Sequence, residues 1–217
     1  MLKDRVLFLD GEALVIDKPA GLPVDPPRAG GISVASHGAE LAFEFRRWPT
    51  AVHRLDQDTS GCLLLARNPK AHARFSQAFE TGTVEKRYLA ILAGLPEGEE
   101  GLIDLPLAKV STREAGWRMV PDPAGKPART RWRLIATHEG RSLVEFRPET
   151  GRTHQIRIHA QGGLGAPVLG DPVYGAPDRR GMMLHAAALV VPRAGKPAIA
   201  VEAPWPARFA DAGFASG

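Results

Sequence analysis

Short apolar runs separated by turn-forming residues mark the beginning of the chain. Residues 6–9 and 13–16 are apolar on either side of Asp10-Gly11, a dipeptide typical of tight hairpin turns, so this stretch predicts two antiparallel strands. Proline and glycine then interrupt regular structure over residues 18–31. A further apolar strand is expected over Cys62–Ala66, where the single cysteine is interpreted as a small core residue rather than a nucleophile.

Two helices are indicated before residue 83. Ser33 is a residue type that caps helices, and the helix it would begin carries Leu41 and Phe45 on one face. Asn68-Pro69 combines a capping residue with proline at the first helical position and predicts a second helix, which Gly82 would end. The buried stripe of this second helix should consist of Ala71, Phe75, Ala78 and Phe79.

Strand patterns dominate the second half of the chain. We expect a loop or hairpin over 116–125, a short helix over Thr153–Gln161 and a loosely held tail over about 204–217. Strands are predicted at Arg87–Ala93, 142–147, 184–191 and 197–202. Since strands and helices do not alternate regularly, the pattern favours an α+β fold around a largely antiparallel sheet. Without a repeat or a linker, residues 1–217 are expected to form one domain.

Composition narrows the class of protein. Of the 217 residues, 44% are hydrophobic and 24% are charged, which is ordinary for a folded protein. No stretch of the sequence approaches the length of a membrane span, and the first residues lack the apolar run of a signal peptide. A single cysteine excludes an internal disulfide framework, and we expect a cytoplasmic protein.

Positive charge is concentrated in one part of the chain. The formal net charge is +4, while residues 109–157 alone contain eleven Lys and Arg against five Asp and Glu, a local charge of 11 − 5 = +6. Arg129, Arg131 and Arg133 recur with the period of a strand that has one solvated face. Three guanidinium groups in a row would suit the phosphate backbone of a nucleic acid, although an ordinary solvated strand face gives the same pattern.

The most informative string runs from His53 to Gly61 and reads His-Arg-Leu-Asp-Gln-Asp-Thr-Ser-Gly. It places Asp56 two residues after Arg54, in a polar turn that leads directly into the apolar strand at Cys62. A turn next to a strand holds a side chain more firmly than a flexible loop, as an acid that must be aimed requires. An ordinary salt-bridged turn would look the same.

A second string, Gly151 to His159, carries two arginines and two histidines into the short helix. The histidines are five residues apart, about 140° around a helix, and therefore do not share a face as metal ligands would. Arginines beside the carboxylates would also oppose a cation, so we expect no metal. An Asp–Arg pair is the better interpretation, because a guanidinium keeps a carboxylate ionised and fixes its orientation. Such pairs are also common structural devices.

Together these strings resemble a known family. The order and type of five motifs are those of the RluA family of pseudouridine synthases, over about Leu14–Pro204. The motifs are the strings 18–24, 53–61, 86–90, 151–159 and 184–186. The resemblance implies a pseudouridine synthase fold, with a mixed, mainly antiparallel and bent sheet, flanking helices and two lobes around an RNA-binding cleft. It also implies isomerisation of uridine in structured ribosomal or transfer RNA, with no cofactor.

The resemblance also implies roles for single residues. Asp56 matches the catalytic aspartate, Tyr88 a tyrosine that packs on the target base, and Arg157 the arginine paired with the carboxylate. Substrate contacts are expected from Arg54, which would fill the space of the flipped nucleotide, and from Ile156, Arg152 and His53. Each role has a competing interpretation. Tyr88 could be a core tyrosine, and Arg152 a scaffold or phosphate contact. His53 and His154 could make structural hydrogen bonds. His185 is expected to be a packed polar residue, and Lys18 could line the cleft.

The chemistry suits these residue types. Uracil must leave C1′ through N1, rotate and rejoin through C5, which develops positive charge on the sugar and negative charge on the base. Asp56 could stabilise or trap the sugar cation or abstract the 2′ proton, and the sequence does not choose. Extruding the nucleotide from folded RNA costs a few kcal/mol, which backbone contacts and an inserted Arg54 would offset.

Two departures from the family pattern concern RNA contacts. The sequence begins almost at the catalytic core, without the S4-type RNA-binding domain that many relatives carry, and Val24-Asp25 stands where relatives often have a histidine. We expect a monomer that needs no membrane and no protein partner. A carboxylate-dependent RNA or nucleoside glycosidase and an inactive RNA-binding module remain the competing functions.

Overall fold

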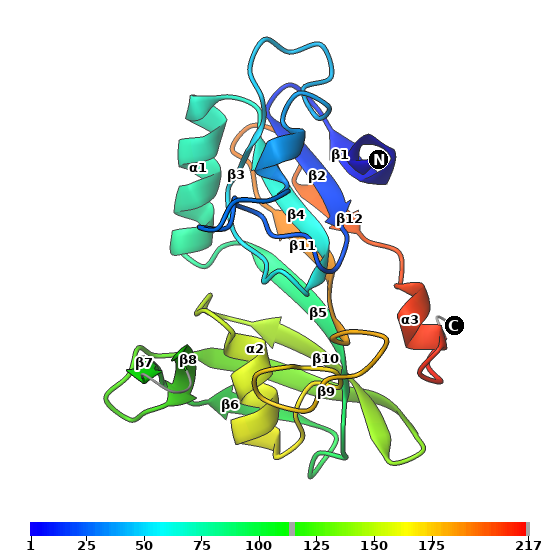
Figure 1. The fold of residues 1–217 in the computed structure, drawn as a ribbon. Helices are drawn as coiled ribbons and strands as arrows, with labels where there is room; N and C mark the ends of the chain where they lie inside the picture. Colours follow the sequence, from blue (N-terminus) through cyan, green and yellow to red (C-terminus); the bar gives the residue numbers. More distant parts are fainter. Residues whose placement is uncertain (113–115, 216–217) are drawn as a thin grey trace. The chain divides into compact units, whose positions relative to one another are not determined.

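The computed structural model describes residues 1–112 and 116–215. The chain forms two compact units (Figure 1). The first unit contains Met1–Lys86 and His185–Pro204, and the second contains Arg87–Leu184 and the chain from Trp205 onward. Among the described residues, no helix is long and apolar enough to cross a bilayer.

The first unit is built on a mixed sheet with the strand order β1-β2-β4-β11-β12. These strands are Val6–Leu9, Ala13–Lys18, Ser60–Ala66, Leu184–Val191 and Ile199–Glu202, and the short strand β3 (Thr50–Ala51) pairs with β4. A 3₁₀ turn, Leu2–Arg5, precedes β1. All neighbours are antiparallel except β4 and β11, which pair in parallel at Ser60–His185 and Gly61–Ala186. The predicted strands around Asp10 and at Cys62 are confirmed, and Cys62 is buried.

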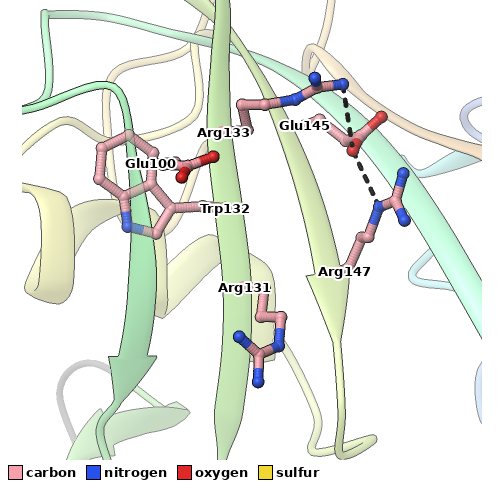
Figure 2. A pocket seen from close by; sticks show the side chains of 6 residues that line it. All are labelled: Glu100, Arg131, Trp132, Arg133, Glu145 and Arg147. Atoms are coloured by element: carbon pink, nitrogen blue, oxygen red, sulfur yellow. Dashed lines mark hydrogen bonds and ion pairs between the residues drawn. The ribbon is translucent and has the colours of Figure 1, made fainter.

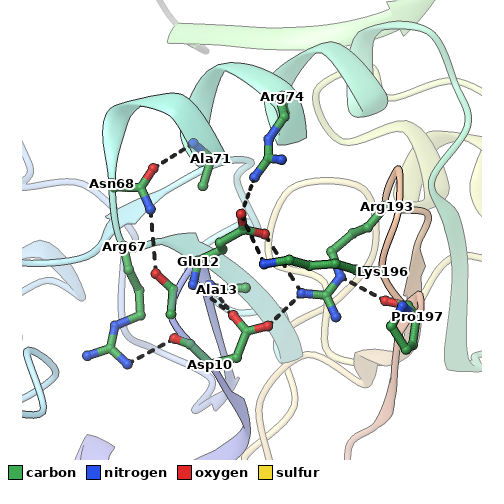
Figure 3. A network of polar contacts seen from close by, with 11 residues as sticks. Asp10, Glu12, Ala13, Arg67, Asn68, Ala71, Arg74, Arg193, Lys196 and Pro197 are labelled. Atoms are coloured by element: carbon green, nitrogen blue, oxygen red, sulfur yellow. Dashed lines mark hydrogen bonds and ion pairs between the residues drawn. The ribbon is translucent and has the colours of Figure 1, made fainter.

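The turn between β1 and β2 is held by its own aspartate (Figure 3). Asp10 Oδ1 accepts hydrogen bonds from the backbone N–H groups of Glu12 and Ala13, at 2.8 and 2.9 Å, which is how an aspartate closes a tight turn. The other oxygen of Asp10 accepts a hydrogen bond from Arg193. Because Arg193 lies beyond β11, this ion pair connects the first strands to the last ones.

The helix predicted at Asn68 is confirmed as α1 (Pro69–Glu80). The Asn68 side chain accepts a hydrogen bond from Ala71 N at 2.8 Å, and Gly82 follows the helix in a left-handed conformation. Ala71 and Phe75 are buried against β2, β4, β11 and β12, and Ala78 and Phe79 are partly buried at the same core. Helix α1 therefore covers one face of the first unit's sheet.

The helix predicted from Ser33 is wrong. Only a 3₁₀ turn, Ala35–His37, forms there, and the Ser33 hydroxyl bonds within it to Ser36. Leu41 is fully buried, whereas 44% of the Phe45 surface stays exposed and its ring lies under the Arg67 guanidinium. The two residues therefore do not form one apolar helix face, and without such a face a helix has little to stabilise it.

The second unit is an antiparallel sheet with the order β5-β10-β9-β6. Its strands are Glu85–Leu92, Arg141–Pro148, Arg129–His138 and Glu100–Asp104. A separate hairpin pairs β7 (Leu107–Thr112) with β8 (Gly116–Pro121), so the predicted loop or hairpin at 116–125 begins as a strand. Helix α2 (Gln155–Ile158) continues as a π-helical turn, His159–Gly163, within the predicted 153–161 helix. The α+β prediction is confirmed.

The prediction of a loosely held tail after Ala203 is wrong for the described residues. A short helix, α3 (Ala207–Ala210), buries Phe209 completely, and Phe214 is 4% exposed beside His138. Arg208 donates to the carbonyl oxygens of Met182 and Leu184. The two phenylalanine side chains supply enough buried apolar surface to fix a proline- and glycine-containing segment.

Candidate active site

Asp56 lies in the turn that leads into β4. Its side chain is neither sealed in the core nor fully exposed, and its carbonyl oxygen accepts a hydrogen bond from Thr59 N at 3.1 Å. The turn is anchored by its neighbours Leu55, Thr59 and Ser60, which are buried. It therefore offers a carboxylate at the surface of a rigid segment.

The end of this turn depends on a glycine. Gly61 has φ 109°, a conformation that favours glycine, and a Cβ at this position would collide with the backbone of Ala186 in the parallel strand β11. His185 is buried there and its Nδ1 lies 2.9 Å from the Ser60 hydroxyl, which confirms that it is a packed polar residue. The close pairing of β4 with β11 holds the Asp56 turn from behind.

Lys18 supports the same turn. Its side chain is fully buried and its ammonium group donates to the carbonyl oxygens of Pro19, Leu22 and Gln57, at 2.8–2.9 Å. Gly21 N also donates to Gln57 O at 2.9 Å. The expectation that Lys18 could line a cleft is wrong, because its side chain is buried and its ammonium group is hydrogen-bonded to backbone carbonyl oxygens. The Lys-Pro-Ala-Gly string instead positions the residue that follows Asp56.

His53 and Arg54 behave differently although they are adjacent. His53 Nε2 accepts a hydrogen bond from Leu64 N at 3.0 Å, and its ring stacks on Phe79 at 4.4 Å. Burial, with the nearby charge of Lys86, lowers the pKa of His53 to about 3, so the imidazole is neutral. These contacts favour the structural interpretation of His53.

Arg54 is available to a ligand. Its side chain is 81% exposed, and its Nε lies 3.5 Å from Asp25 Oδ2. Asp25, one of the residues that departs from the family pattern, is therefore the counter-ion of the arginine expected to enter the RNA. An exposed ion pair of this kind contributes at most about 1 kcal/mol, so RNA could displace it at little cost.

In the second unit, Tyr88 is the last residue of the less buried first half of β5. It pairs with Phe146 of β10, so its side chain lies on the same sheet face as Phe146 and Trp132. Leu89 to Leu92 are buried, whereas Tyr88 is only partly so, unlike a typical core tyrosine. The prediction of a strand buried on both faces holds only for this second half of β5.

Helix α2 covers the same face and is fixed by Gln155. The buried Gln155 amide accepts from Thr150 Oγ1 and Arg152 N, at 2.7 and 2.9 Å, and donates to Arg129 O and Thr130 Oγ1, at 3.0 and 2.9 Å. Arg152 itself is exposed and donates to Pro127 O. These hydrogen bonds of Gln155, called the Gln155 clamp below, attach the Gly151–His159 string to β9. They also fix the backbone just before Ile156 and Arg157.

Arg157, two residues after this clamp, forms a buried ion pair with Asp171. Its Nε and Nη2 donate to the two Asp171 oxygens, each at 2.7 Å, and the side chains are 6% and 0% exposed. Burial alone would raise the pKa of Asp171, but hydrogen bonds and charge from Arg157, with the N–H groups of Val173 and Tyr174, outweigh it and hold the pKa below its usual value. Ile156 is 7% exposed beside Arg157.

Sequence reasoning missed Asp171. The backbone requires glycine at the preceding position, because Gly170 has φ 79° and a Cβ there would collide with the Gly181 carbonyl. The string Gly170-Asp-Pro, with its glycine and proline on either side of the aspartate, is a signal of a constrained polar turn and could have marked it. Asp171 is a partner of Arg157 within the same unit. The predicted pairing of Asp56 with Arg157 and the predicted packing of Tyr88 on the target base stay predictions.

The register places the three arginines of β9 on the opposite sheet face from Tyr88 and α2. Figure 2 shows two of them, Arg131 and Arg133. Arg131 and Arg133 line a hollow of about 300 Å³ together with Arg147 and the largely buried Glu145, whose carboxylate accepts from Arg147 Nε at 2.9 Å. Glu145 also lies 3.8 Å from Arg133 Nη2, and Glu149 lies 2.8 Å from Arg131 and 3.6 Å from Arg129. This face carries its own counter-ions, which favours the solvated strand face over a phosphate track.

His159, the last residue of the Gly151–His159 string, has a structural role. His159 is buried, with Nδ1 2.8 Å from Thr130 Oγ1 and Nε2 3.1 Å from Leu105 O. Across residues 1–112 and 116–215, no group of three or more His, Cys, Asp or Glu side chains gathers as a metal site would require.

The chain is similar in sequence to known RNA pseudouridine synthases. The family model described as RNA pseudouridylate synthase matches residues 12–162. An uncharacterized RNA pseudouridine synthase of Zymomonas mobilis is 57% identical over 217 residues, 99% of either chain. The ribosomal large subunit pseudouridine synthase D of the same organism is 39% identical over 79% of this chain and 56% of its own length.

Solved structures extend the match to the fold. The human RNA pseudouridylate synthase domain containing 4 superimposes with a TM-score of 0.80 and 25% identity, over 96% of this chain and 91% of that one. The human RNA pseudouridylate synthase domain containing 1 gives a TM-score of 0.77 and 28% identity, over 92% of this chain and 82% of that one. The mixed, mainly antiparallel sheet of the prediction is confirmed by these matches.

Proposed function

Since the chain belongs to the RluA family of RNA pseudouridine synthases, which are isomerases, we propose that it converts specific uridines of structured RNA with Asp56 as the catalytic carboxylate. The observation that carries the assignment of Asp56 is its placement. The side chain is accessible, while Lys18, Gly61 and the buried residues around it make the turn rigid. A rigid turn keeps a carboxylate oriented without an ordering cost during each turnover.

The proposed roles follow from the charges that the reaction develops. As the bond from C1′ to N1 breaks, the carboxylate of Asp56 stabilises the positive sugar, either by charge, by covalent capture or by taking the 2′ proton. The released uracil must stay in place to rejoin through C5. Tyr88, half-buried in the first half of β5, is proposed to hold the ring, and its phenol to relay the C5 proton.

Arg157 and Arg54 complete the proposed machinery. Two donor groups of Arg157 are committed to Asp171, which fixes the plane of the guanidinium. From this fixed plane the group is proposed to orient the Asp56 carboxylate. Arg54, exposed and only loosely paired, is proposed to occupy the stack that the flipped nucleotide leaves. Ile156 and Arg152 are proposed to contact the substrate.

We propose ribosomal RNA as the first substrate to test, with transfer RNA as the second. The likeness to relatives whose names place them at the large ribosomal subunit supports this order. This chain covers only about half of those relatives, so their substrate is an expectation and no more. We further propose that the enzyme acts as a monomer in the cytoplasm, where these RNAs are found.

The decisive experiment compares Asp56→Asn with Asp58→Asn, a carboxylate of the same turn. RNA from cells that lack the protein is incubated with each variant, and pseudouridine is mapped by its carbodiimide adducts. We expect Asp56→Asn to bind RNA but form no pseudouridine, and Asp58→Asn to retain activity. Turnover by Asp56→Asn at the wild-type rate would refute the assignment. Abasic ribose in place of pseudouridine would identify a glycosidase, and binding without any conversion by the wild type would identify an inactive module.

A further inference from the structure

Trp117 is an exposed indole on the β7–β8 hairpin of the second unit. Its surface is 49% exposed, although tryptophan carries more apolar area than any other side chain and is usually highly buried. It lies on β8 opposite Ser111, on the hairpin face that also carries Leu107 and Met119. Leu107 and Met119 pack against Ile158 of α2, so this face of the hairpin is turned toward α2.

One edge of the indole rests on His154. The two ring centroids are 5.2 Å apart with an angle of 31° between the planes, close to a tilted stack. His154 is held in a left-handed backbone conformation, φ 54°, immediately before the Gln155 clamp. Lys109 Nζ lies 4.9 Å from the centre of the Trp117 ring. The indole is thus positioned by its neighbours and still offers half of its surface to a ligand.

A continuous row of rings connects Trp117 with Arg157. The His154 and Tyr174 rings meet edge to face at 5.6 Å, with His154 Nδ1 2.9 Å from the Tyr174 hydroxyl. Tyr174 in turn lies 5.1 Å from the Arg157 guanidinium carbon. The Tyr174 hydroxyl also accepts a hydrogen bond from Met119 N of β8 at 3.1 Å, which ties the hairpin to the row.

The surroundings suit RNA. Lys109, Arg118 and Arg152 supply positive charge on the hairpin and the α2 approach, and a hollow of about 260 Å³ opens beside Met119 and Tyr174. Unpaired RNA bases are recognised by stacking on aromatic side chains among basic residues, because every base has a flat π-face. A peptide-binding groove would instead need a longer apolar surface than a single indole provides.

We infer that Trp117, backed by His154, stacks an unpaired base of the RNA that flanks the target uridine. The inference rests on the proposed function, since Arg157, at the other end of the row, is there assigned to the active site. Such a contact would be tolerant of base identity and would help to hold the flanking strand while the uridine is turned out. Trp117 would thus be a binding residue rather than a catalytic one.

The test uses the full chain and an RNA hairpin whose loop contains seven uridines, together with the same hairpin carrying abasic loop residues. Indole fluorescence and binding are measured by titration. We expect Trp117→Ala to weaken binding of the uridine hairpin by roughly 5- to 150-fold, the effect of one lost base stack. Trp117→Phe should keep most of the affinity, and Trp48→Ala, at a 61% exposed indole of the first unit, should keep all of it.

The abasic hairpin separates stacking from other causes. It should bind wild type and Trp117→Ala equally and should leave the indole emission unquenched. Equal binding of the uridine hairpin by wild type and Trp117→Ala would overturn the inference, and so would an equal loss for both RNAs, which would indicate a backbone or protein-binding surface. If the wild type forms no pseudouridine but this stacking signature is present, the proposed function fails, and only the assignment of Trp117 as a base-stacking residue stands.

Discussion

Replacing Asp171 by asparagine removes one charge from a buried pair and changes little else in shape. At the observed N–O distance of 2.7 Å, the attraction between the two charges is about 6 kcal/mol at an effective dielectric constant of ~20. Desolvation offsets part of this, and loss of one partner of a buried pair costs about 3–5 kcal/mol because the other charge stays buried. We therefore expect Asp171→Asn to lower the free energy of unfolding by about 3–5 kcal/mol.

The measurement is urea unfolding of wild type, Asp171→Asn and Asp178→Asn. Asp178 is the matched control, because it also accepts two hydrogen bonds from one guanidinium, that of Arg180, besides one from Arg180 N, but its side chain is 19% exposed. Its replacement should cost at most about 1 kcal/mol. Equal losses for the two variants would refute the reasoning from burial.

The pH dependence gives a second readout for Asp171. Since its folded pKa is lower than the unfolded value of about 3.9, its contribution is present in full above that value. It is lost as the pH falls from about 4 through the folded pKa. The asparagine variant should lack this part of the acid dependence. In the proposed enzyme, the same change should lower kcat more than RNA affinity, because it releases Arg157.

Two further predictions concern the first unit. Lys18→Met removes a donor from three carbonyl oxygens, of which Gln57 O still accepts from Gly21 N. It should cost about 3 kcal/mol in urea unfolding and slow pseudouridine formation, whereas the exposed Lys70→Met should change neither. Equal effects of the two variants would contradict the role given to Lys18. His53 stays neutral in the folded chain down to about pH 3, so the unfolded state alone takes up its proton below about 6.5 and stability should fall as the pH drops between these values. Measured against pH, stability of His53→Gln should fall less steeply, and an unchanged slope would argue against this pKa.

Local signals explain what could be predicted from the sequence. Asp10-Gly11 and Asn68-Pro69 act through hydrogen bonds within a few residues, and the structure has the turn and the helix where the sequence placed them. The turn, strand and helix predicted for Asp56, Tyr88 and Arg157 are likewise present, as the turn before β4, as β5 and as α2. The helix predicted from Ser33 does not form, because a capping residue can start a helix only where an apolar face follows to stabilise it.

Long-range contacts explain what could not be predicted. A buried lysine is rare, and the three carbonyls that accept from Lys18 come from two segments about forty residues apart. Asp171 gains its importance only when the chain folds it against Arg157, fourteen residues earlier. In the same way, the tail is ordered by the burial of Phe209, a packing interaction that local composition does not reveal.

The parallel pairing of β4 with β11 affects how the protein can be made. Ser60 and His185 meet across 125 positions of the chain, and closing such a loop costs about 4 kcal/mol of chain entropy before any contact forms. During translation, the segment that carries Asp56, the proposed catalytic acid, must therefore wait until β11 has left the ribosome. A nascent chain stalled before residue 185 would expose the β4 edge to aggregation and chaperones, and the Asp56 turn would gain its support only after β11 has been synthesised.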